Sequence, residues 1–447
     1  MKKTLLTSLV ACFAVFASQN TCAQSAAATT IGPDGHIRCG TMENLKLMKQ
    51  QDPGIEAQMA EMDAEIMRQI ELQKKDPTTQ SVVITIPIVF HIVWETAAQN
   101  VSDNCINAQL AVLNADYRKL NTDWTKVTQP GWAALVADCE IQFCLATKDP
   151  TGASTTGITR TQTTAAPFGT SGDPVKFNSS GGKDIWDRNK YLNIWVCDLS
   201  SGLLGYAQFP GGGASTDGVV IDYQYMVGSA GCGTAPYNLG RTSTHEVGHW
   251  LSLYHIWGDD GTACTGSDQC SDTPNQGGEN YTCWTAGTVR TGSCGAGSDG
   301  SPSSTASPGY MWMNYMDYTD DACMYMLTNG QKTRITAAMN GSTRVGLTTS
   351  AVTNCSITGV EETILSGNIS IFPNPSTGEV FINTELSNIN TMDLKVYNAI
   401  GEAVVTKKIN VSSGETKINL SSKPDGIYLF EVKTSEGTIT KKVIINR

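Results

Sequence analysis

Three of the five histidines in this 447-residue chain lie within the eleven residues from His245 to His255. On a helix, residues four apart differ by about 40° of net rotation, so His245 and His249 project from one face, one turn apart. Glu246 is offset from His245 by about 100°, close enough to reach a metal-bound water without binding the metal itself. This spacing is the usual way in which a helix offers two ligands to zinc, which lowers the pKa of such a water to about 7.

The third histidine constrains the backbone. On a continuous helix, about 15 Å of rise would separate His255 from His245, so the two could not share a metal. The chain must therefore leave the helix after His249 and turn back. Glycine is the usual residue for such a turn because it adopts positive φ freely, but this sequence has Ser252. A serine in that conformation costs about 1–2 kcal/mol, which a metal bond can offset.

Other interpretations of these residues stay open at this point. Ser243 and Glu246 fit a capping box, in which Glu246 caps a helix and the histidines are ordinary buried side chains. His91 lies in an apolar run near Trp94, and we expect it to be a core residue.

The N-terminus predicts an exported protein. Lys2 and Lys3 precede an apolar run that is too short to cross a bilayer of about 30 Å, which is typical of a signal peptide, residues 1–23. We expect no transmembrane segment in the mature protein. The net charge of −11, without a Lys/Arg cluster, excludes nucleic acid as a partner. In an oxidising compartment we expect most cysteines after residue 78 to form disulfides.

Composition divides the remaining chain into three sections. Residues 24–78 are polar and predict helices broken at Asp52-Pro53-Gly54; they cannot bury a core and are interpreted as a pro-segment. Residues 79–357 combine a helix at 104–117 with buried strands expected at 82–90, 140–145, 192–196 and 219–223. Residues 358–447 show the short alternating segments of a small β-sandwich. The predicted fold class is therefore α+β.

The histidine segment resembles the elongated zinc motif of metzincin metallopeptidases. Its flanks, Tyr237 to Thr242 and Ile256 to Asp259, and the downstream segment Met313 to Met324 are similar to the pappalysin (cytophagalysin) family in particular. The departure from the family pattern is Ser252, where a glycine is usual. The resemblance implies a metzincin-like catalytic domain, with a mixed sheet and an active-site helix, that hydrolyses peptide bonds of extracellular proteins.

The resemblance also assigns roles to residues. The ligands of a catalytic zinc would be His245, His249 and His255. Glu246 would act as general base and then as general acid. Met316 would form an apolar floor beneath the metal, and Tyr318 would stabilise the oxyanion. A strand near 203–207 would hold the peptide extended.

Further implications concern the loops around the site. The implied disulfides, which would staple the irregular stretch 264–307, are Cys264–Cys294 and Cys283–Cys323; none is assigned to Cys270. A calcium site would use the oxygens of Asp268, Asp272 and Thr273. Asp320 or Asp321 would line the S1′ pocket and favour Arg or Lys after the scissile bond.

The pro-segment contains Arg38-Cys39-Gly40-Thr41, which resembles the cysteine switch of latent relatives. The Cys39 thiolate would be the fourth zinc ligand until the pro-segment is cut, near Arg68 or at Lys74-Lys75. The alternative is that Cys39 is half of a disulfide.

The last section resembles the C-terminal sorting domain of type IX secretion cargo, through the segments Ile371–Ser376, Val396–Asn398, Gly426–Tyr428 and Lys441–Ile444. It implies passage through the periplasm and across the outer membrane, with the type IX machinery as partner. A carbohydrate- or protein-binding sandwich is the alternative. For the whole chain, a surface binding protein with an inactive metal site and a zinc hydrolase of non-peptide bonds remain open beside the secreted, latent zinc endopeptidase.

Overall fold

The computed structural model describes residues 30–75, 83–129, 131–261, 263–292, 294, 309–353, 369–384, 391–398, 402–410, 415–434 and 437–447. The expected signal peptide and the expected boundary between residues 357 and 358 lie outside these ranges. Among the described helices, none is both long and apolar enough to cross a membrane.

A mixed sheet forms the centre of the larger folded region, with strand order β2-β1-β4-β6-β5 and β3 also paired to β1. The strands are β1 (Ile84–Trp94), β2 (Ile141–Leu145), β3 (Ile158–Gln162), β4 (Leu192–Cys197), β5 (Gly205–Ala207) and β6 (Val219–Asp222). All pairs are parallel except β5 with β6. Eight successive residues of β1 are buried, which explains why its sequence is continuously apolar rather than alternating. The short strand β5 lies at one edge of the sheet.

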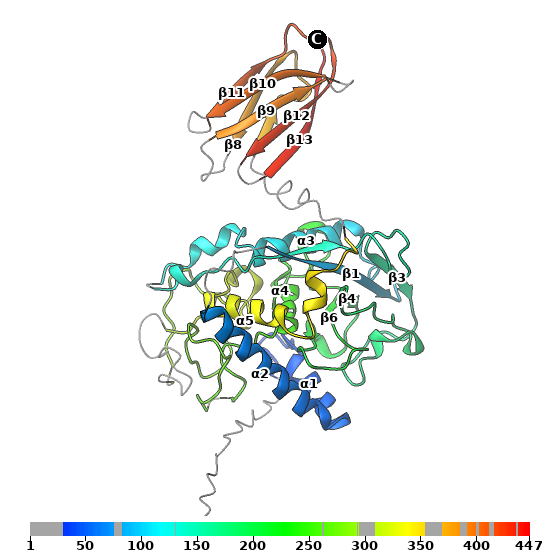
Figure 1. The fold of residues 1–447 in the computed structure, drawn as a ribbon, viewed down its shortest axis with the longest axis vertical. Helices are drawn as coiled ribbons and strands as arrows, with labels where there is room; N and C mark the ends of the chain where they lie inside the picture. The colour runs from blue at the N-terminus through cyan, green and yellow to red at the C-terminus, as the bar shows by residue number, and fades with distance from the viewer. Residues whose placement is uncertain are drawn as a thin grey trace, which may run out of the picture.

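Helices surround this sheet (Figure 1). They are α1 (Thr41–Gln51), α2 (Gly54–Lys75), α3 (Asp103–Tyr117), α4 (Arg241–Trp250), α5 (Asn329–Asn340) and α6 (Val345–Thr348). Short 3-10 helices are η1 (Thr122–Lys126), η2 (Ala133–Leu135), η3 (Pro174–Lys176), η4 (Asn178–Ser180), η5 (Ser200–Gly202), η6 (Gly228–Ala230) and η7 (Asp321–Cys323). The predicted break between two pro-segment helices is confirmed at Asp52 and Pro53. The sequence did not predict β3, α5 or α6.

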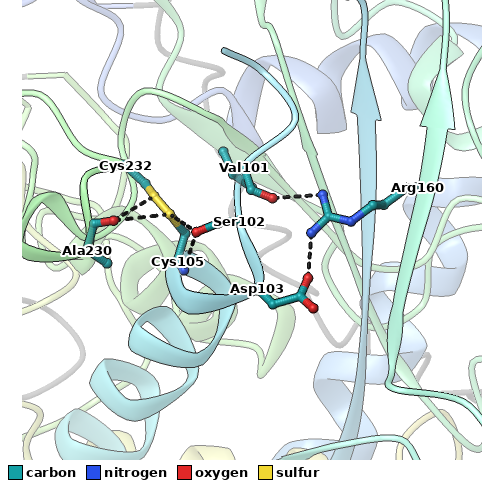
Figure 2. The surroundings of a disulfide bond; sticks show 7 residues. All are labelled: Val101, Ser102, Asp103, Cys105, Arg160, Ala230 and Cys232. Atoms are coloured by element: carbon teal, nitrogen blue, oxygen red, sulfur yellow. Dashed lines mark hydrogen bonds and ion pairs between the residues drawn. A yellow bond between two sulfur atoms is a disulfide. The ribbon is translucent and has the colours of Figure 1, made fainter. Parts of the chain in front are cut away.

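Three disulfides join described residues: Cys105–Cys232, Cys264–Cys294 and Cys283–Cys323. The last two are the pairs implied by the resemblance. The first connects the start of α3 to the loop before α4, across 127 positions (Figure 2). Beside it, Arg160 of β3 donates to the carbonyl of Val101 and pairs with Asp103, which fixes the same end of α3. Cys270 is buried and belongs to none of these three disulfides.

The C-terminal section forms two antiparallel sheets, of order β10-β9-β12-β13 and β11-β8-β7. The strands are β7 (Ile369–Phe372), β8 (Glu379–Thr384), β9 (Thr391–Tyr397), β10 (Ala403–Asn410), β11 (Thr416–Asn419), β12 (Gly426–Thr434) and β13 (Gly437–Ile445). Alternating residues of β9, such as Met392, Leu394 and Val396, are buried in a core that is separate from the catalytic core. This is the small β-sandwich that the sequence predicted.

Candidate active site

Helix α4 carries the first two histidines and ends where the sequence requires a turn. Ser252 N donates to His249 O at 2.8 Å and Leu253 N donates to Gly248 O at 2.9 Å, the bond pair of a Schellman motif. Ser252 adopts the left-handed conformation with φ of +74°. The serine therefore makes the turn that a glycine usually makes, and the chain reverses toward His255.

A buried arginine holds this turn. Arg334 of α5 donates through Nε to Ser252 O at 2.6 Å and through Nη2 to Ser252 Oγ at 3.2 Å. A glycine at this position would offer only the carbonyl oxygen. The hydroxyl thus supplies a second acceptor that offsets part of the cost of a serine at positive φ.

The three imidazoles converge on one point. The Nε2 atom of His249 lies 3.1 Å from those of His245 and His255, and the latter two are 3.3 Å apart. Zinc bonded to nitrogen at about 2.0–2.1 Å in a tetrahedron separates its ligand nitrogens by about 3.3 Å. The donor set and its spacing therefore fit a zinc ion.

Each ring is oriented by a hydrogen bond on its other nitrogen. Nδ1 of His245 lies 2.6 Å from Tyr315 O, and Nδ1 of His249 lies 2.7 Å from Leu253 O. Nδ1 of His255 lies 2.7 Å from a carboxylate oxygen of Asp259.

Because all three acceptors are oxygens, the proton of each neutral ring belongs on Nδ1 and the Nε2 lone pairs face one another. Burial lowers the pKa of His245 and His249 well below the usual value, which keeps these rings neutral. Three buried lone pairs that face one another are a metal site.

Glu246 lies beside this centre rather than in it. Its Oε2 accepts from Thr41 Oγ1 at 2.8 Å, and Oε1 is buried without a hydrogen-bond partner among the described residues. Burial raises the pKa of Glu246 to about 7, although the hydrogen bonds from Thr41 and Cys39 oppose the shift. The capping-box interpretation is wrong, because α4 begins at Arg241 and Ser243 Oγ makes no cap.

Met316 and Tyr318 both lie close to the histidine cluster. Met316 is fully buried, and a Cβ added to Gly248 of α4 would lie 2.5 Å from its sulfur, so the methionine packs directly against the helix. The ring centroid of Tyr318 lies 5.7 Å from that of His245 and 5.0 Å from that of His255.

An N-terminal segment around Cys39 lies against the histidine cluster. The Cys39 sulfur and the three histidine nitrogens lie within 4.8 Å of one another, and Cys39 is a thiol rather than half of a disulfide. Its neighbours run parallel to the edge of β5, with Ile37 bridged to Leu203 and Gly40 N donating to Gly205 O at 2.9 Å. The predicted edge strand is therefore present and is already paired with this chain's own segment.

Asp321 forms an ion pair with an arginine of the same segment. Arg38 is buried; its Nη2 lies 3.0 Å from Asp321 Oδ1 and its Nη1 donates to Thr242 Oγ1 at 2.6 Å. Its guanidinium also lies over the ring of Tyr237, with 4.7 Å to the centroid. Of the two candidate carboxylates, Asp321 makes this ion pair, whereas Asp320 is only partly buried.

The two aspartates expected to bind calcium make hydrogen bonds to different parts of the chain. Asp268 accepts from Thr273 Oγ1 at 2.8 Å. Asp272 instead accepts from Thr328 Oγ1 and from Gly330 N, at the first turn of α5. Asp272 therefore stabilises a helix start, a role that the sequence did not reveal because α5 itself was not predicted.

These features together define a metallopeptidase: two histidines on a helix, a third after a turn, an adjacent buried carboxylate and a pairing edge strand. A family model described as pregnancy-associated plasma protein-A, of the M43 peptidases, matches residues 177–340. An extracellular metalloprotease of Verticillium alfalfae is 31% identical over 332 residues, which cover 69% of this chain and 94% of that protein. The chain belongs to the pappalysin family of metalloendopeptidases. A model of the secretion system C-terminal sorting domain matches residues 370–446, so it is an exported member.

Solved structures agree with this assignment. A promirolysin mutant of Tannerella forsythia is 40% identical, with a TM-score of 0.60, and the match covers 69% of this chain and 96% of that one. Mature mirolysin in complex with a cleaved peptide is 44% identical, with a TM-score of 0.55, and the match covers 60% of this chain and 97% of that one.

Proposed function

We propose that this protein is a secreted zinc endopeptidase, made as a latent precursor, that cleaves extracellular proteins before Arg or Lys. The observation that carries the proposal is the convergence of three buried Nε2 atoms and one cysteine sulfur on a single point. Neutral imidazoles with one thiolate are a preferred donor set for zinc. When bound there, zinc supplies Lewis acidity that polarises a carbonyl and makes a water acidic near neutral pH.

The chain's own residues perform the remaining tasks. Glu246 takes a proton from the attacking water on a carboxylate oxygen and later delivers it to the leaving amine nitrogen. The Tyr318 hydroxyl is proposed to donate to the oxyanion, and Met316 supports the histidines from below. The backbone of β5 holds the substrate extended once the pro-segment has left.

Arg38 supports the preference for a basic residue after the scissile bond. It shows that a guanidinium fits the pocket formed by Asp321, Thr242 and Tyr237. A substrate arginine would make the same charge-assisted contact with Asp321 Oδ1, which is stronger than a hydrogen bond between neutral groups.

Latency and export complete the proposal. Residues 24–78 are the pro-segment, in which Cys39 would supply the fourth ligand to zinc in place of water, and Thr41 donates to Glu246. The precursor form among the similar structures supports this division of the chain. Residues 1–23 direct the chain to the periplasm, 79–357 form the peptidase, and 358–447 address it to the type IX machinery.

A calcium ion near Asp268 and Thr273 is a separate proposal. It uses the oxygens of Asp268, Asp272 and Thr273, and both carboxylates accept hydrogen bonds from the protein in this structure. Titration of the metal-free protein with Ca²⁺ tests it: a rise in the unfolding temperature that Asp268→Asn abolishes supports calcium, and no rise removes it.

The main proposal is tested by assaying casein cleavage and zinc content together. The wild-type precursor should not cleave casein, whereas the protein from which the pro-segment has been cut and removed should. A chelator should abolish the activity and added zinc should restore it. Zinc-loaded but inert mature protein would instead identify a binding protein, and cleavage of esters without peptides would identify a different hydrolase.

A further inference from the structure

The pro-segment contacts the enzyme at a second place, away from the metal. Helix α2 lies alongside α5 (Figure 1). Its residues Met62, Ile66 and Ile70, spaced four apart, form one apolar stripe. They are buried with Ala337 and Ala338 of α5 in a cluster that is separate from the main core.

Two acidic residues flank this stripe. Asp63 pairs with Arg334 Nη2 and accepts from Tyr254 Oη at 2.6 Å. Glu65 accepts from Ser342, through the backbone N at 3.0 Å and through Oγ at 2.8 Å. The surface that α2 covers therefore consists of an apolar strip on α5, flanked by the guanidinium of Arg334 and the hydroxyl of Tyr254.

This second contact reaches the catalytic turn. Arg334 is the residue that holds Ser252, and Tyr254 immediately precedes His255. The Asp63 carboxylate of α2 thus binds both Arg334, which holds the turn, and Tyr254, which lies within the segment that leads to His255. The charge pair also fixes the register of α2 on α5, since the apolar stripe alone would tolerate sliding by one turn.

We propose that the face formed by α5, Arg334 and Tyr254 is a binding site for α2 that holds the pro-segment independently of Cys39. A cut between α2 and β1 then leaves a nicked complex in which the pro-segment stays bound and remains an inhibitor. Release requires a further cut within α2, where Arg68 is exposed on the opposite side from the stripe. The inhibitory part of this inference rests on the proposed latent peptidase, whereas the binding part does not.

The test uses the full chain carrying Glu246→Ala, which prevents self-cleavage. A recognition sequence for a site-specific protease replaces residues 76–80, and the purified protein is cut there. Co-elution of the pro-segment with the remainder on size exclusion, followed over time, gives its dissociation rate.

Asp63→Asn should speed dissociation by at least about tenfold, since a charge-assisted hydrogen bond is lost. Tyr254→Phe, which keeps the ring, should act in the same direction. Glu61→Gln, at an exposed position of the same helix, is the matched control and should dissociate at the wild-type rate. Cys39→Ser alone should leave most of the pro-segment bound.

The inference is overturned if Cys39→Ser alone releases the pro-segment at once, or if Asp63→Asn and Tyr254→Phe both match Glu61→Gln. Faster release by Asp63→Asn with no effect of Cys39→Ser on release supports this inference, and the role of Cys39 at the metal is then decided by the zinc and casein assays alone. The two proposals therefore fail separately.

Discussion

At the scale of single residues, Ser252 explains how this chain departs from its family's pattern and keeps the same turn. The serine accepts two hydrogen bonds from Arg334, and both are specific to the bent backbone. Part of the energetic cost of positive φ is thus offset within the protein before any metal binds. Arg334 acts through the turn and is a positioning residue for His255.

This role predicts a rescue. Arg334→Gln should weaken zinc binding and kcat/KM by about tenfold, the factor that corresponds to the 1–2 kcal/mol cost of the left-handed serine. Ser252→Gly should be nearly neutral alone and should restore most of the loss in the double variant, because glycine needs no help to adopt this φ. Zinc affinity is measured by chelator competition and kcat/KM by peptide cleavage. If Arg334→Gln lowers both equally with Ser252 and with the Ser252→Gly change present, Arg334 does not have this role.

Gly248 gives a second prediction at this scale. A methyl group there would meet the Met316 sulfur at 2.5 Å, so Gly248→Ala should displace the floor of the site. We expect a loss of about 1–3 kcal/mol of stability and reduced activity. Gly213→Ala, at a position where an added Cβ meets its nearest atom at 3.4 Å, is the control. The account of Met316 is wrong if the two variants have the same melting temperature and activity.

At the scale of elements, the helices and strands that could be predicted from the sequence were those with a clear pattern of apolar residues or a recognisable motif. Strand β1 was predictable because its burial is continuous, and the histidine spacing fixed α4. Helix α5 was not predicted, because its buried face includes Gln331, Arg334 and Ala337, which give only a weak apolar pattern. The Arg334 contacts and the pairing of Cys105 with Cys232 depend on distant segments, which no local pattern encodes.

His91 of β1 gives a prediction for the sheet. Its ring bonds Thr159 of β3 at 2.8 Å and Asn193 of β4 at 3.0 Å, so it joins three strands. Burial lowers its pKa from 6.5 to about 4. Above pH 6.5, His91 is neutral in both the folded and the unfolded chain. Below pH 6.5, His91 of the unfolded chain gains a proton, whereas His91 of the folded chain stays neutral.

Stability should therefore fall between pH 6.5 and pH 4, with about 3 kcal/mol of that loss due to His91. His91→Gln should make the pH dependence of the unfolding free energy shallower across this window, by about one proton at most. Denaturant unfolding at several pH values measures it, and identical slopes for the two proteins would contradict the assignment.

At the scale of the whole molecule, the chain combines a peptidase with a C-terminal sorting domain, and the two have separate cores. The N-terminal segment that we propose as the inhibitor instead places Cys39 beside the three histidines. In that segment, Arg38 pairs with Asp321, Cys39 lies beside the three histidines, and Thr41 donates to Glu246. The sequence motif revealed Cys39, but the partners of Arg38 and Thr41 required the fold.

The most direct test of the central claim is peptide-library cleavage by the activated enzyme and by its Glu246→Ala variant, with zinc content measured for both. We predict about one zinc per chain in each protein, cleavage before Arg or Lys by the wild type, and loss of that cleavage in the variant by several orders of magnitude. A zinc-loaded variant that still cleaves the same bonds at a comparable rate would contradict the account.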